Sequence, residues 1–197
     1  MKAIKELKKN LKPGRVYRRS DLAQWSNAVD RHLKQLVKEK VLQKVSQGLY
    51  YYPMKASFGN VPPEDEKLVQ VFLKSKDFLL TTPNLYNSLG VGTTQLYNKR
   101  VVYNYKRHGQ FMLGGKLFYF HLKYKFPKHL SKEFLLVDLL NNLNELAENR
   151  EDVLKSVKEN VLRGSKSKMK KVFNSYAGER TKTLFNKWIT EESLMYA

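Results

Sequence analysis

The sequence predicts an α+β protein, in which helices and short antiparallel strands follow one another along the chain. Apolar residues recur at helical spacing near both ends, whereas β-branched and aromatic residues alternate or cluster between residues 99 and 126. Hydrophobic residues make up 42% of the 197 residues, which is enough for a packed core. We therefore expect one large domain or two small ones.

The N-terminal quarter is expected to contain three helices. Apolar spacing predicts the first over residues 2–11, and Pro13-Gly14 ends it. Ser20 is the expected N-cap of a brief second helix, because a serine hydroxyl accepts a hydrogen bond from the first amides of a helix. Ser26 is the expected N-cap of the third helix, which covers residues 27 to about 40.

A β-hairpin is expected directly after these helices. The stretch 41–53 indicates two β-runs about a turn at Ser46-Gln47-Gly48. Helix, short helix, helix and β-hairpin, in this order, are typical of a winged helix-turn-helix. We therefore expect a winged helix-turn-helix DNA-binding domain over residues 1–55.

A second, mixed domain is expected over residues 57–197. The Gly and Pro residues of 55–63 are typical of a linker. Acidic residues then predict a helix start, and a short helix is expected between Pro83 and Gly90.

The middle of this domain is expected to form a small antiparallel sheet. Three strands are predicted at about 99–126, with turns at His108-Gly109 and Gly114-Gly115. From residue 131 onward the pattern is helical, which predicts a C-terminal helical bundle.

Positive charge is concentrated near the N-terminus. The chain has 37 Lys and Arg against 18 Asp and Glu, a formal net charge of +19. Residues 1–55 carry +10, residues 56–130 carry +7 and residues 131–197 only +2. Because like charges repel in a compact protein, such an excess fits a polyanionic partner. The distribution indicates a polyanion-binding module in front of a differently employed body.

Several classes of protein and of site are excluded. The chain has no cysteine, which excludes a disulfide scaffold, thiolate catalysis and Cys-based zinc sites. It has no phosphate-binding Gly-rich loop, no dinucleotide fingerprint and no Gly-x-Ser-x-Gly elbow. No apolar run of about 18 residues is present, and the N-terminus lacks the uninterrupted apolar core of a signal peptide. We therefore expect a soluble, cytoplasmic protein that is not an enzyme, needs no cofactor or metal and binds no membrane.

The third helix presents a polar face suited to reading bases. Its apolar residues, such as Val29, Leu33 and Leu36, share one arc at about 100° per residue. The opposite arc holds five polar side chains and no acid at its centre: Asn27, Arg31, Lys34, Gln35 and Lys38. Such side chains pair with base edges in the major groove, which admits an α-helix. We expect this face to contact DNA, although a solvated helix of any basic protein would look similar.

Residues around this helix are expected to contact the DNA backbone. Arg18 and Arg19 immediately precede Ser20, and together with the amides of that helix start they are expected to hold a phosphate. Three further polar residues lie at or near the hairpin tip, where winged helices contact an adjacent groove or phosphates: Lys44, Ser46 and Gln47.

These segments resemble a known family. GRVYRRSDL (14–22) and SNAVDRHLKQLVKEKVLQKVSQGLYYYP (26–53) are similar to the N-terminal module of the AbiEi-type antitoxins. In that family a winged helix ends in a wing of the form Gly-Leu-Tyr…Pro, here Gly48-Leu49-Tyr50 and Pro53. The resemblance continues through TTPNLYNSLGVGTTQL (81–96) and EFLLVDLLNNLNEL (133–146), and it covers roughly residues 12–190.

The resemblance implies a transcriptional regulator of a type IV toxin–antitoxin system in bacterial phage defence. Such a regulator represses its own operon and neutralises a partner toxin of the nucleotidyltransferase class. The implied DNA contacts are the outer face of residues 27–38 and the wing around residues 44–47. The toxin-neutralising role falls to the C-terminal region, where no short motif maps. A single winged helix reads a short stretch of double-stranded DNA, which fits dimerisation on an inverted repeat.

Two other functions stay open from the residues alone. A protein–protein interaction module could use the basic surface for an acidic partner, with the winged helix only as a scaffold. A nuclease is the third candidate, because Glu64-Asp65-Glu66-Lys67 contains an acid-x-Lys pattern. Consecutive side chains at a helix start diverge around its axis, however, and acids there complement the helix dipole.

Overall fold

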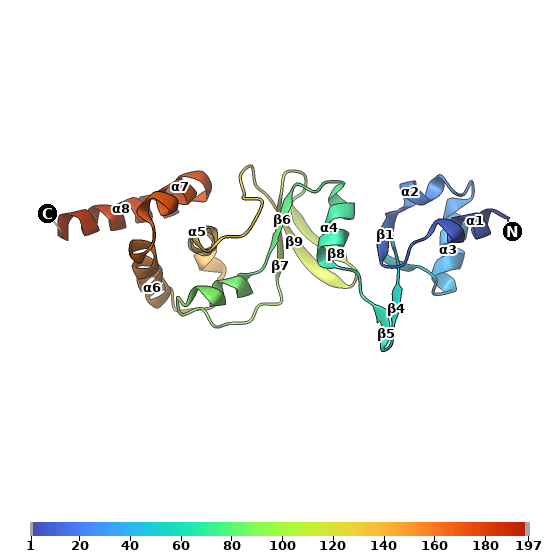
Figure 1. Cartoon of the computed structure of the whole chain (residues 1–197), viewed down its shortest axis with the longest axis horizontal. Coiled ribbons are helices and arrows are strands. Elements are labelled where there is room, and N and C mark those ends of the chain that lie inside the picture. The colour runs from blue at the N-terminus through green and yellow to red at the C-terminus, as the bar shows by residue number, and fades with distance from the viewer. Residues whose placement is uncertain (1, 196–197) are drawn as a thin grey trace. The chain divides into compact units, whose positions relative to one another are not determined.

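The computed structural model describes residues 2–195, and of residues 2, 3 and 195 only the backbone. It is an α+β protein with helices and small antiparallel sheets (Figure 1). The chain packs as two units: unit 1 comprises residues 1–78 and 104–122, and unit 2 comprises residues 79–103 and 123–197. Unit 1 therefore adds two later segments to the first 55 residues. The expected domain boundary at residues 55–57 stays a prediction.

Unit 1 begins with three helices and a three-stranded antiparallel sheet of order β1-β3-β2. The elements are α1 (Lys2–Asn10), β1 (Arg15–Arg18), α2 (Arg19–Ala23), α3 (Val29–Lys38), β2 (Gln43–Ser46) and β3 (Leu49–Tyr52). The three helices and β1 close on one apolar core, made by Leu7, Tyr17, Leu22, Leu33, Leu36 and Leu42. Gly48, at φ +70°, supplies the left-handed residue of the β2–β3 turn.

The expectation that Ser20 and Ser26 are helix N-caps is wrong. Helix α2 begins at Arg19, so Ser20 lies inside it, and the Arg18 N–H donates to Asp21 Oδ2 at 3.1 Å. Helix α3 begins at Val29, three residues after the buried Ser26, whose Oγ accepts the Ala28 N–H at 3.3 Å and lies 2.7 Å from His32 Nδ1. Because α2 begins one residue before Ser20, the carboxylate of Asp21 lies in the first turn and accepts the N–H of Arg18, the residue before the helix.

The segment expected to be a linker is a second hairpin. β4 (Met54–Ala56) pairs antiparallel with β5 (Gly59–Val61), and Gly59 at φ +117° permits the tight turn. The buried Tyr51 donates its hydroxyl to the Val61 carbonyl at 2.8 Å, which anchors the hairpin to β3. The linker expectation is wrong because Gly can mark a hairpin turn as well as a flexible join.

The remainder of unit 1 is a helix and a hairpin. α4 (Asp65–Leu73) packs against β1, and β8 (Gly109–Leu113) pairs antiparallel with β9 (Lys116–Leu122). The turn between them is Gly114-Gly115, as the sequence predicts. The Gly114 N–H donates to the Val45 carbonyl of β2 at 2.8 Å, so this turn is hydrogen-bonded to the first sheet.

Unit 2 is mostly helical. It contains most of β6 (Phe78–Thr81) and of β7 (Arg100–Asn104), the 3-10 helices η1 (Pro83–Leu89) and η2 (Leu143–Glu145), and the helices α5 (Lys132–Asn142), α6 (Arg150–Arg163), α7 (Lys166–Tyr176) and α8 (Glu179–Met195). Every residue of 134–140 in α5 is buried, so α5 is the central helix of this unit. Phe173 of α7 stacks on Phe185 of α8 with ring centroids 4.1 Å apart. The predicted helical bundle from residue 131 is present.

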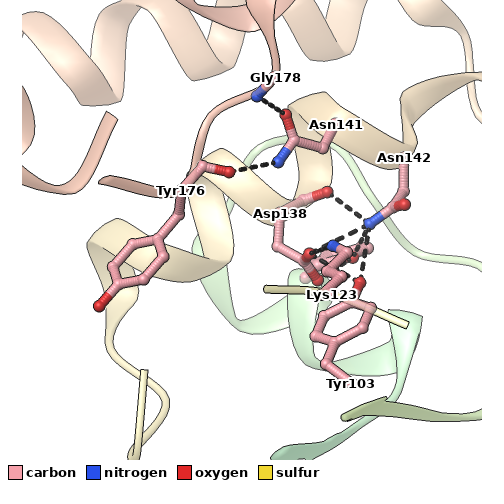
Figure 2. Close-up of polar contacts among 8 residues, drawn as sticks. Tyr103, Lys123, Asp138, Asn141, Asn142, Tyr176 and Gly178 are labelled. Carbon is pink, nitrogen blue, oxygen red and sulfur yellow. Dashed lines mark hydrogen bonds and ion pairs between the residues drawn. The ribbon is translucent and has the colours of Figure 1, made fainter. Parts of the chain in front are cut away.

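A buried carboxylate organises the polar interior of unit 2. Asp138 of α5 is fully buried and accepts hydrogen bonds from the Tyr86 and Tyr103 hydroxyls, at 2.8 and 2.7 Å. Lys123 Nζ lies 3.5 Å from Asp138 Oδ1 and 3.6 Å from the centroid of the Tyr103 ring. Figure 2 shows Asn142 donating to the same carboxylate. The charge of Asp138 is therefore both paired and hydrogen-bonded.

A neighbouring side chain ties this helix to the bundle. Asn141 donates to the Tyr176 carbonyl at 3.0 Å and accepts from the Gly178 N–H at 3.0 Å, as Figure 2 shows. Tyr176 is the last residue of α7, and Gly178 immediately precedes α8. Asn141 therefore links α5 to the end of α7 and to the start of α8.

None of the helices between residues 2 and 195 has the length and hydrophobicity that a membrane-spanning segment requires.

Candidate nucleic-acid interface

Helix α3 separates its apolar and polar side chains. Val29, His32, Leu33 and Leu36 are buried against the core. The five side chains that the sequence assigns to DNA reading are all exposed: Asn27, Arg31, Lys34, Gln35 and Lys38. Asn27 lies before the helix, which starts two residues later than expected. The polar face is therefore open to solvent.

The acidic residues beside this face are paired with cations from other elements. Asp30 accepts hydrogen bonds from Arg19 Nε and Nη2, at 2.7 and 2.6 Å, and these bonds lower the pKa of Asp30. Glu39 accepts from Lys8 Nζ at 2.7 Å and from Gln35 Nε2 at 2.8 Å. The bond from Lys8, and after it that from Gln35, lowers the pKa of Glu39.

The cations of the polar face of α3 are not neutralised by ion pairs within the described part of the chain. Within the part of the chain that the structure describes, no ion pair involves Arg31, Lys34 or Lys38. The two flanking carboxylates are neutralised by Arg19 and Lys8, which lie outside the face. The exposed surface of α3 is therefore a positive stripe. Gln35 already has a side-chain partner, because its Nε2 donates to Glu39 Oε1.

The structure places the two adjacent arginines differently. Arg19 forms the bidentate pair with Asp30, and its N–H donates to the Gly48 carbonyl at 2.9 Å. The Arg18 N–H donates to Asp21. The amides of both arginines are therefore used inside the protein, and only the side chains remain to meet a phosphate.

The predicted residues of the β2–β3 turn lie together. Lys44 and Gln47 are exposed and Ser46 is half-buried. The pairing register of β2 with β3 shifts between Lys44 and Ser46, as at a β-bulge or a similar irregularity. A bulge re-aims the side chains next to it. The turn therefore carries one cation and two uncharged polar groups on a bent strand.

One guanidinium nitrogen near this region lacks an acceptor. Arg18 Nη2 is shielded from solvent and has no hydrogen-bond partner among residues 2–195. Burial lowers the pKa of Arg18, the Asp21 charge opposes this, and Arg107 adds to the lowering. Arg18 lines an open hollow of about 450 Å³ together with Ser20, Lys74 and Lys76. The two lysines follow α4 and were missed because no local pattern joins them to Arg18.

The acid-x-Lys segment is not a carboxylate cluster. Glu64 pairs with Lys67 at 2.8 Å, and Asp65 pairs with Lys116 of β9 at 2.6 Å. The two carboxylates thus turn toward different cations. The described residues hold no group of three or more His, Cys, Asp or Glu side chains that could ligate a metal ion.

Comparisons of the chain with protein-family models, with curated proteins and with solved structures give no match.

Proposed function

We propose that this chain is a DNA-binding transcriptional regulator whose first 55 residues act as a winged helix-turn-helix. In this proposal α2 and α3 are the helix-turn-helix, α3 enters the major groove and the β2–β3 turn is the wing. The order of elements supports it, because three helices precede a hairpin whose second strand, β3, pairs with β1, the strand between the first two helices. Such a regulator acts where the DNA is, in the cytoplasm.

The observation that carries the proposal is the positive stripe of α3. Among residues 2–195 its cations form no ion pair, while Asp30 and Glu39 are each paired with a cation from another element. A face prepared in this way attracts phosphates and offers Arg and Gln side chains to base edges. Gln35 exchanges its bond to Glu39 for a bond to a base. A merely solvated helix would satisfy its cations with the acids beside them.

The wing completes the proposed contact. Lys44, Ser46 and Gln47 meet the backbone beside the groove that α3 enters, and they position the protein without reading sequence. If about six phosphates are neutralised, the logarithm of the affinity falls with the logarithm of salt concentration at a slope of about −5. A steep slope of this kind separates DNA binding from apolar association.

The biological role that we propose rests on the resemblance to AbiEi-type antitoxins. The protein would repress its own operon and neutralise a nucleotidyltransferase-like toxin. DNA binding falls to residues 1–55 and toxin binding to residues 57–197. Two chains would pair on an inverted repeat with half-sites about 10 or 20 bp apart.

The decisive experiment compares two duplexes at about 150 mM salt, where sequence-independent contacts are weak. One is the DNA upstream of the protein's own gene and the other is its scrambled counterpart. We expect at least about a 100-fold preference, which is about 2.7 kcal/mol. Arg31→Ala with Lys34→Ala should lose the preference. Lys168→Ala with Lys170→Ala, an equal charge change on exposed residues of α7, should keep it. Equal, weak binding to both duplexes would overturn the proposal.

A second function is favoured by a pocket in unit 2. The pocket holds about 300 Å³, and its lining includes four leucines and three cations: Leu140, Leu143, Leu154, Leu184, Arg150, Arg180 and Lys187. This composition fits an acidic protein segment that inserts one apolar side chain. As a protein-interaction module, the chain would bind an alternating Glu-Leu peptide in a salt-sensitive manner. Arg180→Gln with Leu154→Asn would weaken that binding.

A further inference from the structure

Arg18 carries a hydrogen-bond donor that the protein itself does not satisfy. Its Nη2 is out of contact with solvent and has no acceptor among residues 2–195. Arg19, the next residue, directs its guanidinium to both oxygens of Asp30. Buried donors are nearly always paired in native proteins, so an unpaired guanidinium nitrogen points to an acceptor from outside, toward which the Arg18 side chain turns.

The place for such an acceptor lies next to Arg18. An open hollow of about 450 Å³ is lined by Arg18, Ser20 and Asp21 on one side and by Lys74, Ser75 and Lys76 on the other. Three cations thus face one carboxylate. Oδ2 of that carboxylate already accepts the Arg18 N–H. The hollow is therefore positive.

The end of α4 places its lysines at this hollow. Lys74 adopts φ +53° and ψ +41°, a left-handed conformation that ends the helix. Lys106 Nζ donates to the carbonyls of Leu73 and Lys74, at 3.2 and 3.1 Å. This cation neutralises the negative end of the helix, which would otherwise repel an anion. No ion pair is formed by Lys74 or Lys76 in the described part of the chain.

The donors in the hollow match a phosphoryl group. A guanidinium pairs with two oxygens of one phosphate, and lysines add charge without demanding a fixed geometry. The hollow is open rather than enclosed, so it suits a group that remains attached to a large molecule. A DNA backbone passing α3 offers such groups at regular spacing.

We infer that this hollow is a seat for one phosphodiester group of the DNA backbone, held by Arg18 with Lys74 and Lys76. The inference rests on the proposed function. It extends the DNA contact beyond residues 1–55 to the end of α4, a part of the sequence outside the predicted DNA-binding domain. The contact positions the protein on DNA and reads no bases.

The test is a salt titration of DNA binding by the full chain. The variant is Lys74→Asn with Lys76→Gln, because Asn tolerates the left-handed conformation of residue 74. The control is Lys125→Gln with Lys128→Gln, an equal charge change on exposed residues of unit 2. We expect the variant to bind every duplex about tenfold more weakly at about 150 mM salt, with a salt slope shallower by about 1 to 2. The control should change affinity less than about twofold.

If the two double variants have the same DNA affinity and the same salt slope, the inference is overturned. The proposed function still stands in that case if the wild type prefers the duplex from upstream of its own gene. Loss of affinity in the Lys74 and Lys76 variant without any preference for that duplex would overturn the proposed function and support the seat.

Inorganic phosphate distinguishes the source of the phosphoryl group. Its effect on the thermal midpoint is compared with that of chloride at equal ionic strength. Phosphate should stabilise the wild type more than Arg18→Lys, because the lysine lacks the guanidinium fork. One outcome would overturn the assignment to DNA. In it, phosphate raises the thermal midpoint only of proteins with an intact hollow, while DNA affinity is equal in all variants. The hollow would then bind free phosphate.

Discussion

Arg19 and Asp30 join the start of α2 to the first turn of α3 through two hydrogen bonds, from Nε at 2.7 Å and from Nη2 at 2.6 Å. The two side chains are 48% and 64% exposed, so the pair adds little to stability. Its effect is on charge and orientation. It neutralises the carboxylate nearest the polar face of α3, and it holds one helix against the other in a fixed geometry.

Removing either partner of this pair should change DNA affinity in opposite directions. Asp30→Ala frees Arg19 and deletes a negative charge, so all duplexes should bind about threefold to tenfold more tightly; Arg19→Ala should weaken binding by a similar factor. Fluorescence anisotropy at fixed salt measures both, and the double variant should lie near wild type. Weaker binding by Asp30→Ala would show that the pair acts by positioning α3.

The same pair has a defined pH dependence. Arg19 lowers the pKa of Asp30, so its contribution is complete above the unfolded value of about 3.9 and is lost as pH falls through the lower folded value. The pair is therefore intact at neutral pH.

The α3 face and the wing should differ in what they contribute to DNA binding. Arg31→Ala with Gln35→Ala should relax sequence preference, with about 1–3 kcal/mol lost for each base contact. Lys44→Ala should weaken all sequences about equally and reduce the salt slope by about 1. A binding-site selection with each protein measures both effects. If neither variant changes binding, the assigned face of the protein is wrong.

Alkaline pH should destabilise unit 2 through its buried tyrosines. Burial, reinforced by Asp138, raises the pKa of Tyr86 and Tyr103. Above about pH 10 these phenols ionise in the unfolded chain but stay protonated in the folded one, so the unfolded state binds fewer protons and stability falls with pH. Each tyrosine contributes about 1.4 kcal/mol per pH unit.

Urea unfolding between about pH 9 and 11 measures this slope. Tyr103→Phe should make the slope shallower by one such increment, whereas Tyr124→Phe, at an 82% exposed position, should leave it unchanged. Equal slopes in wild type and Tyr103→Phe would contradict the expectation.

Asp138→Asn should strongly destabilise the protein. The change leaves the half-buried Lys123 without its counter-charge, and it places an amide donor at a buried position against tyrosine hydroxyls that donate to Asp138. A loss of about 3–5 kcal/mol is expected. Glu145→Gln is the matched control, because Glu145 forms a more exposed pair with Lys99 in the same unit. That change should cost less than about 1 kcal/mol, measured by urea unfolding.

The two glycines of the β8–β9 turn should differ in their tolerance of alanine. Both have positive φ, +58° at Gly114 and +77° at Gly115. A Cβ at Gly114 would lie 3.2 Å from Leu68 Cδ1, whereas one at Gly115 meets nothing within 4 Å. Gly115→Ala should cost about 1 kcal/mol from backbone strain alone, and Gly114→Ala should cost more. Equal losses in thermal unfolding would show that Leu68 moves aside.

Local patterns predict much of the fold. The apolar spacing of α3, the Gly114-Gly115 turn and the helices from residue 131 follow from the sequence because each depends on neighbouring residues. Pro83 and Gly90 mark a short helix, although it is a 3-10 helix. The hairpin at residues 54–61 was missed because a Gly-rich segment gives no local sign of the Tyr51 hydroxyl that anchors it.

Part of the candidate site could likewise be predicted from the sequence, and part of it could not. The exposure of Arg31, Lys34 and Lys38 follows from helical periodicity. The pairing of Arg19 with Asp30 links residues eleven apart, and the hollow joins Arg18 to Lys74 and Lys76 across much of unit 1. Periodicity says nothing about such distances. Only the packing of α4 against β1 brings these cations together.

The hydrogen bond from the Gly114 N–H to the Val45 carbonyl also protects the sheet. β2 lies at one side of the β1-β3-β2 sheet, so it would otherwise leave a row of backbone groups open to a strand from another molecule. A segment some seventy residues later in the chain covers part of that row. A fragment that ends at residue 55 would lack this hydrogen bond. The exposed edge of its strand β2 could then pair with strands of other molecules, so the fragment should aggregate more readily.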